Sequence, residues 1–183
     1  MGAVALVPSS SFSYFGGAIQ TKCRKIAKFA PGFKYITRMK ISIINGPNLN
    51  LVGVREPEIY GHRSLSEYLD NLVGLYPGVD FDLFQSNHEG AIIDEIQRVG
   101  FDHDGIVLNA GAYTHYSIAI ADALRAVTAP AIEVHISDTQ AREPYRHVSM
   151  IKEACVAVIA GYGLDSYRRA VDCLLEMKNT AKP

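Results

Sequence analysis

The sequence predicts an α/β fold, a single doubly wound, five-stranded parallel sheet with helices on both faces. Two observations support this prediction. Short apolar runs of strand length recur along the chain, and segments with the helical spacing of apolar residues separate them. Because strands that alternate with helices form parallel sheets, we expect the strand order of flavodoxin-like proteins.

The predicted strands are short runs of mostly apolar residues. They cover Ile41–Ile44, Val79–Phe84, Gly105–Leu108, Ala131–Val134 and Cys155–Ala160. Short apolar runs of this length are typical of strands, and those with little polar interruption are typical of strands buried between two layers of helices.

Helices are predicted between and after these strands. Two begin at capping boxes, in which a serine and a glutamate three residues later satisfy free backbone N–H groups: Ser64 with Glu67, and Ser86 with Glu89. Apolar residues at helical spacing follow both boxes. The other two predicted helices cover Ser117–Arg125 and Tyr167–Met177.

Length and charge limit the possible classes of protein. With 183 residues, 48% of them hydrophobic, the chain can form one good core but is too short for two ordinary domains. Residues 1–40 contain seven basic residues and no acidic one, whereas residues 41–183 contain 11 basic and 19 acidic residues. An acidic folded part argues against binding to nucleic acid. No apolar run approaches the ~20 residues of a membrane span.

Residues 1–38 are interpreted as an N-terminal extension and residues 39–183 as the catalytic domain. The serines, the basic residues and the lack of acidic residues in the extension resemble a transit peptide. The alternative, which we favour because Met39 directly precedes the first strand, is a tail or a mis-called start. Three scattered cysteines, Cys23, Cys155 and Cys173, have no metal-ligand spacing and suit a reducing compartment, so we expect a cytoplasmic protein.

Polar residues follow the first predicted strand where it ends. Asn48 and Asn50 come just after a turn, at the edge where open α/β sheets place their ligands. Farther along, Arg55 precedes Tyr60, and a nearby cation favours the phenolate form of tyrosine, a strong general base. The alternative is that Arg55 pairs with a neighbouring glutamate on the surface while Tyr60 caps the core.

A second polar group follows the third and fourth predicted strands. Asn109 and His115 come after the third strand, and Glu133, His135 and Ser137 lie at the end of the fourth. We expect them to meet the loop residues named above, because the carboxyl ends of parallel strands share one edge. Glu133 and His135 lie on the same face of a strand, so the carboxylate can orient the imidazole as a general acid. The alternative is a structural histidine.

Other residues and absences narrow the chemistry. Arg142 and Arg146 are either a solvated surface pair or ligands for anions and hydroxyl groups. No lysine lies between Ile41 and Ile151, which removes Schiff-base chemistry from the predicted site. The sequence has no GxxxxGK[ST] phosphate loop, and its six histidines show no metal-ligand pairing.

Six motifs in order carry a resemblance to a known family. They are Ile44–Leu51, Arg55–Pro57 with Tyr60-Gly61, Phe84–Asn87 with Glu89-Gly90, Leu108–His115, Glu133–Ser137, and Arg142-Glu143 with Arg146-His147. Through these motifs the chain from Met39 to about Met177 resembles the type II 3-dehydroquinate dehydratases. The resemblance implies a lyase that dehydrates 3-dehydroquinate to 3-dehydroshikimate by anti elimination through an enolate, without a Schiff base, a metal or an organic cofactor.

The resemblance also implies a role for each catalytic residue. Tyr60 takes the proton at C2, and Arg55 and Arg142 lower its pKa. His135, oriented by Glu133, protonates the departing C1 hydroxyl. A water on the enolate oxygen is held by Asn48.

Substrate binding and assembly are implied in the same way. The expected ligands are Asn109, Ile136 and Ser137 for the carboxylate, His115 and Arg146 for ring hydroxyls, and Asp122 from a neighbouring subunit. Family members form trimers that assemble into a dodecamer, so we expect a homo-oligomer. Asp138 stands where the family usually has asparagine, which adds negative charge near the carboxylate pocket.

Two other classes of protein share parts of this pattern. A flavin or nucleotide binder has the same fold, but it needs a first loop rich in Gly, Ser or Thr, which the segment Gly46–Asn50 is not. A catalytically inactive family member is the second alternative.

Overall fold

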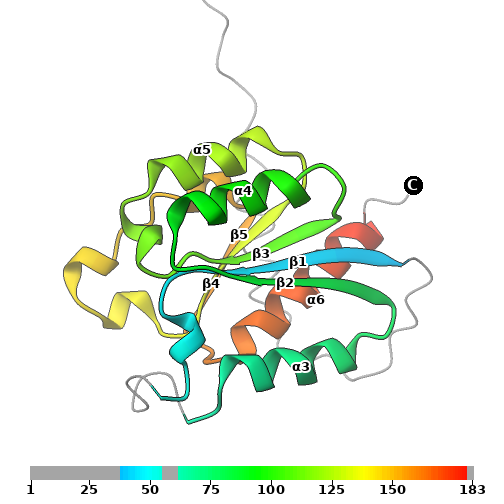
Figure 1. Ribbon diagram of the computed structural model, residues 1–183, viewed down its shortest axis with the longest axis horizontal. Coiled ribbons are helices and arrows are strands. Elements are labelled where there is room, and N and C mark those ends of the chain that lie inside the picture. The colour runs from blue at the N-terminus through cyan, green and yellow to red at the C-terminus, as the bar shows by residue number, and fades with distance from the viewer. Residues whose placement is uncertain (1–37, 55–61, 181–183) are drawn as a thin grey trace, which may run out of the picture.

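The sheet has the architecture that the sequence predicts. The computed structural model describes residues 38–54 and 62–180. Its strands are β1 (Met39–Asn45), β2 (Val79–Gln85), β3 (Gly105–Asn109), β4 (Ala131–His135) and β5 (Ala157–Ala160). They form one five-stranded sheet in the order β2-β1-β3-β4-β5, and all neighbours are parallel (Figure 1). The predicted α/β class and flavodoxin-like strand order are confirmed.

Helices cover both faces of the sheet. Helices α3 (Leu65–Leu75) and α6 (Asp165–Thr180) lie on one face, and α4 (Glu89–Val99) and α5 (Ile118–Ala126) lie on the other (Figure 1). Each corresponds to a predicted helix, and α6 is longer than predicted at both ends. This arrangement is the doubly wound pattern expected from alternating strands and helices.

Of the two predicted capping boxes, the one at Ser64 forms and the one at Ser86 does not. The Ser64 side chain accepts a hydrogen bond from the Glu67 N–H at the start of α3, as the capping box predicts. Ser117 caps α5 in the same way, by accepting from the Ile120 N–H. The box at Ser86 does not form, because the Ser86 hydroxyl accepts from the nearer His88 N–H and α4 begins after His88. A local turn takes up the side chain that the pattern assigned to the helix.

The fifth strand begins two residues later than predicted. Residues Lys152–Ala154 form a short 3-10 helix, η5, and the Cys155 N–H donates to the Lys152 carbonyl at its end. Pairing with β4 therefore begins at Ala157, opposite Ile132. The apolar pattern alone does not reveal this turn.

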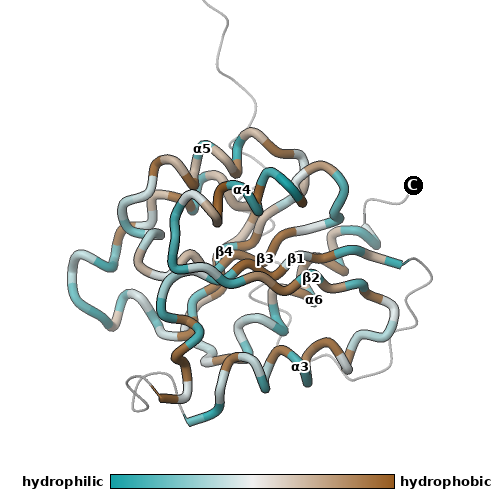
Figure 2. The backbone as a smooth tube through the Cα atoms, in the orientation of Figure 1, coloured by the Kyte–Doolittle hydropathy of each residue, from teal (hydrophilic) through white to brown (hydrophobic). Residues whose placement is uncertain are grey.

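Two apolar cores form, one on each side of the sheet. Ile41 and Ile43 of β1 pack in the core under α3 and α6, whereas Ile44 packs in the core under α4 and α5. Figure 2 shows the apolar central strands between helices in which apolar and polar residues alternate. Because alternate residues of a strand share a face, Asn45 at the end of β1 lies on the α6 side. Asn109 follows Val107 on that side of β3.

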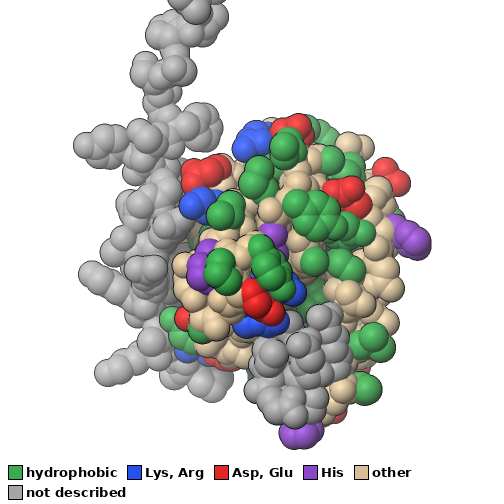
Figure 3. All heavy atoms as spheres, turned by 90° about the vertical axis from the view of Figure 1, so that its left-hand side faces the viewer, with side chains coloured by type: hydrophobic (Ala, Val, Ile, Leu, Met, Phe, Trp, Pro, Cys, Tyr) green, Lys and Arg blue, Asp and Glu red, His purple; other side chains and the backbone are tan. Residues whose placement is uncertain are grey.

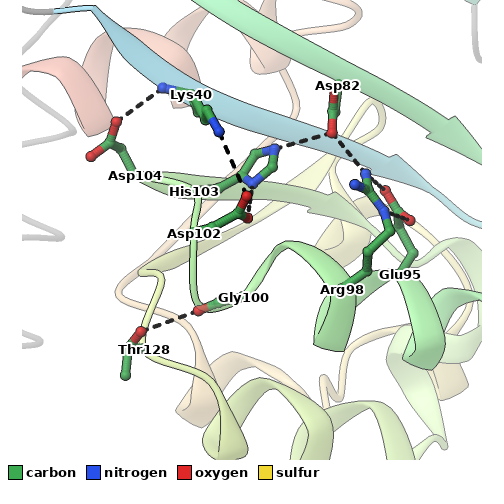
Figure 4. A network of polar contacts seen from close by, with 9 residues as sticks. All are labelled: Lys40, Asp82, Glu95, Arg98, Gly100, Asp102, His103, Asp104 and Thr128. Carbon is green, nitrogen blue, oxygen red and sulfur yellow. Dashed lines mark hydrogen bonds and ion pairs between the residues drawn. The ribbon is translucent and has the colours of Figure 1, made fainter.

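A charged cluster lies away from the carboxyl ends of the strands, between β1, β2 and α4 (Figure 4). Asp82 of β2 accepts hydrogen bonds from Arg98 (2.7 Å) and His103 (3.1 Å). The other ring nitrogen of His103 lies 2.6 Å from Asp102, and only 5% of the His103 side chain is exposed. His103 lies in the turn before β3, and its imidazole joins that turn to the sheet.

Acid is expected to weaken this cluster. The hydrogen bond from Arg98 holds the pKa of Asp82 below its ordinary value. The contribution of Asp82 to stability is therefore complete above its unfolded pKa of ~4 and is lost as the pH falls below it. Asp82→Asn should lower the melting temperature at pH 7 by about 2–4 °C and flatten its dependence on acid pH. Thermal unfolding between pH 3 and 7 measures both effects.

Asp80→Asn is the matched control for Asp82. Asp80 pairs with Arg38, which is 80% exposed, so its loss should change the melting temperature by less than about 1 °C. Equal effects of the two substitutions would contradict a special role for the cluster.

No helix in the part of the chain that the structure describes is long and apolar enough to cross a membrane.

Candidate active site

The site lies at the carboxyl ends of β1, β3 and β4. The strand order reverses between β1 and β3, and in open α/β sheets this switch point opens a crevice for ligands. In Figure 1 these strand ends lie at the left, beside the 3-10 helices η1 (Leu49–Leu51), η3 (Thr139–Ala141) and η4 (Pro144–Arg146). The pocket is lined by Pro47, Asn48, Leu49, Val52, Asn109, Gly111, Ala112, His115, His135, Ile136, Ser137, Thr139, Arg142 and Arg146.

At this crevice the backbone of the loop after β1 lies very close to the backbone at the end of β3. The Gly46 N–H donates to the Asn109 carbonyl (2.8 Å) just past the paired ends of β1 and β3. A Cβ on Gly46 would lie 2.4 Å from the Ala110 carbonyl oxygen, so any side chain would push the strand ends apart. A glycine here lets the loop after β1 lie against β3.

A buried hydrogen bond joins Glu133 and His135 at the end of β4. His135 Nε2 donates to Glu133 Oε1 across 2.6 Å, and Glu133 is 1% exposed. Glu133 Oε2 accepts a hydrogen bond from Ser149 (2.8 Å). Both carboxylate oxygens are thus bonded, which fixes the imidazole and leaves its Nδ1 for a ligand. The predicted pairing of Glu133 with His135 is confirmed, and Ser149 is a residue that the sequence did not reveal.

His115 lies beside this pair at the end of η2 (Gly111–His115). Its ring is stacked on that of His135, with ring centres 6.3 Å apart. His115 Nδ1 donates to the Val148 carbonyl (2.8 Å), which leaves Nε2 as an acceptor in the neutral ring. Burial holds the pKa of His115 below its ordinary value, so the ring is mainly neutral near pH 7.

Asn48 is held in an uncommon conformation by the neighbouring loop. Its φ of 65° lies in the left-handed region, which asparagine adopts more readily than most residues. The Asn48 N–H donates to the Asn87 side chain (2.9 Å), and Gln85 donates to the Gly46 carbonyl (3.2 Å). The end of β2 therefore orients the loop after β1. The sequence motif contains Asn87 and Gln85, but it does not predict these contacts.

Two arginines bring positive charge to the pocket from the segment after β4. The side chains of Arg142 and Arg146 are 13% and 23% exposed, and both lie within ion-pair distance of Glu143. A hydrogen bond from its own backbone N–H, and to a smaller extent the two guanidiniums, hold the pKa of Glu143 below its ordinary value. Of the two alternatives for these residues, a solvated surface pair does not fit their burial.

The remaining predicted ligands divide between the pocket and the surface. Ile136 and Ser137 line the pocket at the end of β4. Asp122 lies on α5, 69% of its side chain is exposed, and it pairs with Arg125 across 3.0 Å. Asp122 does not line the described pocket of its own chain.

Asp138 does not line the described pocket either. Its carboxylate accepts from the Gln140 N–H (2.9 Å) and caps η3. Arg55 and Tyr60 lie outside the described residues, so their placement stays a prediction. Among residues 38–54 and 62–180, no cluster of histidine, cysteine or acidic side chains has the make-up of a metal site.

The fold and the site together define an α/β protein with a polar pocket and a carboxylate–imidazole pair at its switch point. Comparison with known proteins identifies one family. A family model described as dehydroquinase class II matches residues 39–175. The chain therefore belongs to the class II dehydroquinase family of enzymes.

Individual relatives agree with this assignment. The 3-dehydroquinate dehydratase of Carboxydothermus hydrogenoformans is 51% identical over 140 residues, which are 75% of this chain and 91% of the relative. A catabolic 3-dehydroquinase of Penicillium rubens is 49% identical over 134 residues, covering 72% and 86%. The crystal structure of the type II dehydroquinase from Butyrivibrio crossotus has a TM-score of 0.71 and 51% identity, over 75% of this chain and 97% of that chain.

Proposed function

We propose that this protein is a type II 3-dehydroquinate dehydratase. It converts 3-dehydroquinate to 3-dehydroshikimate by anti elimination through an enolate, a step of the shikimate pathway, without a metal, an organic cofactor or a Schiff base. The observation that carries the proposal is the buried Glu133–His135 pair at the edge of a pocket that also contains Arg142 and Arg146. The names of the relatives supply the substrate.

The proposed reaction has two proton transfers. Tyr60 takes the proton from C2, and the electrons of that C–H bond form an enolate with the neighbouring carbonyl. The C1–O bond then breaks while His135 Nδ1 gives its proton to the hydroxyl, which leaves as water. Glu133 stabilises the imidazolium beforehand, because its carboxylate accepts the other N–H of the ring.

Substrate binding uses the opposite charges of the pocket and the ligand. The substrate carboxylate is held by Asn109, by the backbone N–H groups of Ile136 and Ser137 and by the Ser137 hydroxyl, while His115 and Arg146 bind ring hydroxyls. Support comes from their joint position around one pocket. Asn48 also lines the pocket and holds a water on the enolate oxygen, where it stabilises developing charge.

Turnover of 3-dehydroquinate by the purified full chain tests this function directly. The conjugated product absorbs in the ultraviolet, and we expect its appearance without any added metal or cofactor. Borohydride added during turnover should neither inactivate the enzyme nor attach substrate to it, because no lysine lies between Ile41 and Ile151. If no product formed, the proposed function would be refuted. A covalent adduct in the mass spectrum would refute the route without a Schiff base. A visible flavin spectrum would favour the flavin-binding alternative.

We further propose that the catalytic domain spans residues 39–183 in a cytoplasmic homo-oligomer of trimers forming a dodecamer. Tyr116 and Ile118 are about 60% exposed at the start of α5, close in sequence to Asp122. Apolar and charged side chains lie intermixed on the face seen in Figure 3. Exposed aromatic and aliphatic side chains beside a charged residue fit a subunit contact. Asp122 then reaches the neighbouring subunit's site.

Light scattering and kinetics test assembly and the extension together. The full chain and a chain starting at Met39 should both have the mass of a dodecamer and equal turnover. Asp122→Asn should raise KM about tenfold without changing the mass, since it weakens a hydrogen bond to the substrate network. A monomeric mass, or an unchanged KM, would contradict the shared site; loss of assembly on truncation would give the extension a structural role.

A further inference from the structure

Tyr167 of α6 joins the ends of two strands beneath the pocket. Its side chain is fully buried, and its hydroxyl lies 2.6 Å from Asn45 Oδ1 and 2.9 Å from Asn109 Nδ2. Asn45 and Asn109 are partners in the register of β1 and β3, so they lie side by side. Of these residues only Asn109 also lines the pocket, and it is 3% exposed.

The Gly111 N–H fixes the direction of every hydrogen bond in the series that runs from Gly111 through Asn109 and Tyr167 to Asn45. The Gly111 N–H can only donate, and it donates to Asn109 Oδ1 (3.2 Å). Gly111 has a φ of 58°, a left-handed conformation that glycine adopts without steric cost. The nitrogen of the Asn109 carboxamide must therefore face Tyr167, whose hydroxyl accepts from it and donates to Asn45 in turn.

We propose that Tyr167 is a positioning residue that, with Gly111, fixes the Asn109 carboxamide so that an N–H donor, and not the carbonyl, is presented to the pocket. Asn109 Nδ2 has two hydrogens, and Tyr167 takes one of them. The second has no partner among the described residues and is available to a ligand. A donor at this position selects an acceptor group, above all a carboxylate. This inference rests on the proposed function for its substrate.

Burial makes the arrangement insensitive to pH. Desolvation raises the pKa of Tyr167 well above its ordinary value, so the hydroxyl keeps its proton under working conditions. A phenolate could still accept from Asn109 Nδ2, but it has no hydrogen to donate to Asn45 Oδ1, which only accepts. The protonated hydroxyl satisfies both neighbours, since it accepts on one side and donates on the other.

Kinetics of Tyr167→Phe separate a positioning role from a structural one. This substitution removes only the hydroxyl oxygen, and we expect KM for 3-dehydroquinate to rise about tenfold, because the lost bond acts on a charged group. The turnover number should change less than about threefold, since no reacting atom is touched. Tyr76→Phe is the control: Tyr76 is also buried on this face, and its hydroxyl donates to Asp172 (2.5 Å), yet its KM should match the wild type.

A double-mutant cycle identifies the residue through which Tyr167 acts. In an Asn109→Ala background, Tyr167→Phe should change KM less than about twofold, because the group that it positions is already absent. Additive effects on KM would overturn the inference, since they would show that Tyr167 acts by another route. A KM for Tyr167→Phe equal to that of the wild type would overturn it as well.

Crystal structures test the inference even if the proposed substrate is wrong. In the Tyr167→Phe protein, the Asn109 carboxamide should leave the position in which Oδ1 contacts the Gly111 N–H. An Asn109 side chain unchanged in that structure would overturn the positioning role. Failure of the wild type to turn over 3-dehydroquinate would instead refute the proposed function, and the crystal structures would still decide this inference.

Discussion

Replacing His135 with asparagine is expected to lower kcat by about 10³-fold, within the range that general acid–base catalysis contributes. The amide cannot deliver a proton to the departing hydroxyl, so the C1–O bond must break without an acid. The Glu133 carboxylate, which is 1% exposed, keeps a donor from Ser149 and can accept from the new amide. The fold should therefore survive. Steady-state kinetics on 3-dehydroquinate and thermal unfolding measure the two effects.

His88→Asn is the matched control for the loss of an imidazole. His88 is an exposed N-cap residue of α4 that does not line the pocket, and asparagine is a good N-cap residue. Its kcat should stay within about twofold of the wild type, because no catalytic contact is lost. If His135→Asn retained kcat within tenfold of the wild type, His135 would not be the general acid.

Replacing Tyr60 with phenylalanine is expected to lower kcat by about 10³-fold or more, because it deletes the oxygen that accepts the C2 proton. A phenol with a reference pKa near ~10 needs about 4 kcal/mol to act as a base near pH 7. One exposed cation does not supply that much. Arg142, only 13% exposed, lies in the pocket, and we propose Arg55 as the second cation that lowers the pKa of Tyr60. Binding of substrate should remain near that of the wild type.

Tyr145→Phe controls for the removal of a phenol hydroxyl near the site. Tyr145 is 65% exposed, and the Arg146 guanidinium lies 5.2 Å from the centre of its ring, a contact that phenylalanine keeps. Its turnover should match the wild type. A Tyr60→Phe enzyme with turnover within tenfold of the wild type would exclude Tyr60 as the base. Because residues 55–61 lie outside the described part of the chain, this prediction rests on the sequence motif.

Local patterns in the sequence determined the elements and the positions of the main site residues. An apolar run such as Ile41–Ile44 must be buried on both faces, which limits it to a central parallel strand. Glu133 and His135 share a face because strand side chains alternate, and this alternation alone predicts that the two side chains pair. The parallel direction of the strands follows from their alternation with helices. Residues within a few positions of each other decide all of these features.

Only the tertiary structure decided which distant side chains complete the site. Tyr167 contacts Asn45 across 122 positions, and Ser149 reaches Glu133 across 16. His103 is bonded to Asp82 across 21 positions, although its own segment indicates only a turn. A hydroxyl or imidazole finds its partner through the packing of whole elements, and the sequence around it contains no periodic signal of that partner. Buried polar groups must be hydrogen-bonded, but which partner satisfies each one is fixed only when the helices close over the sheet.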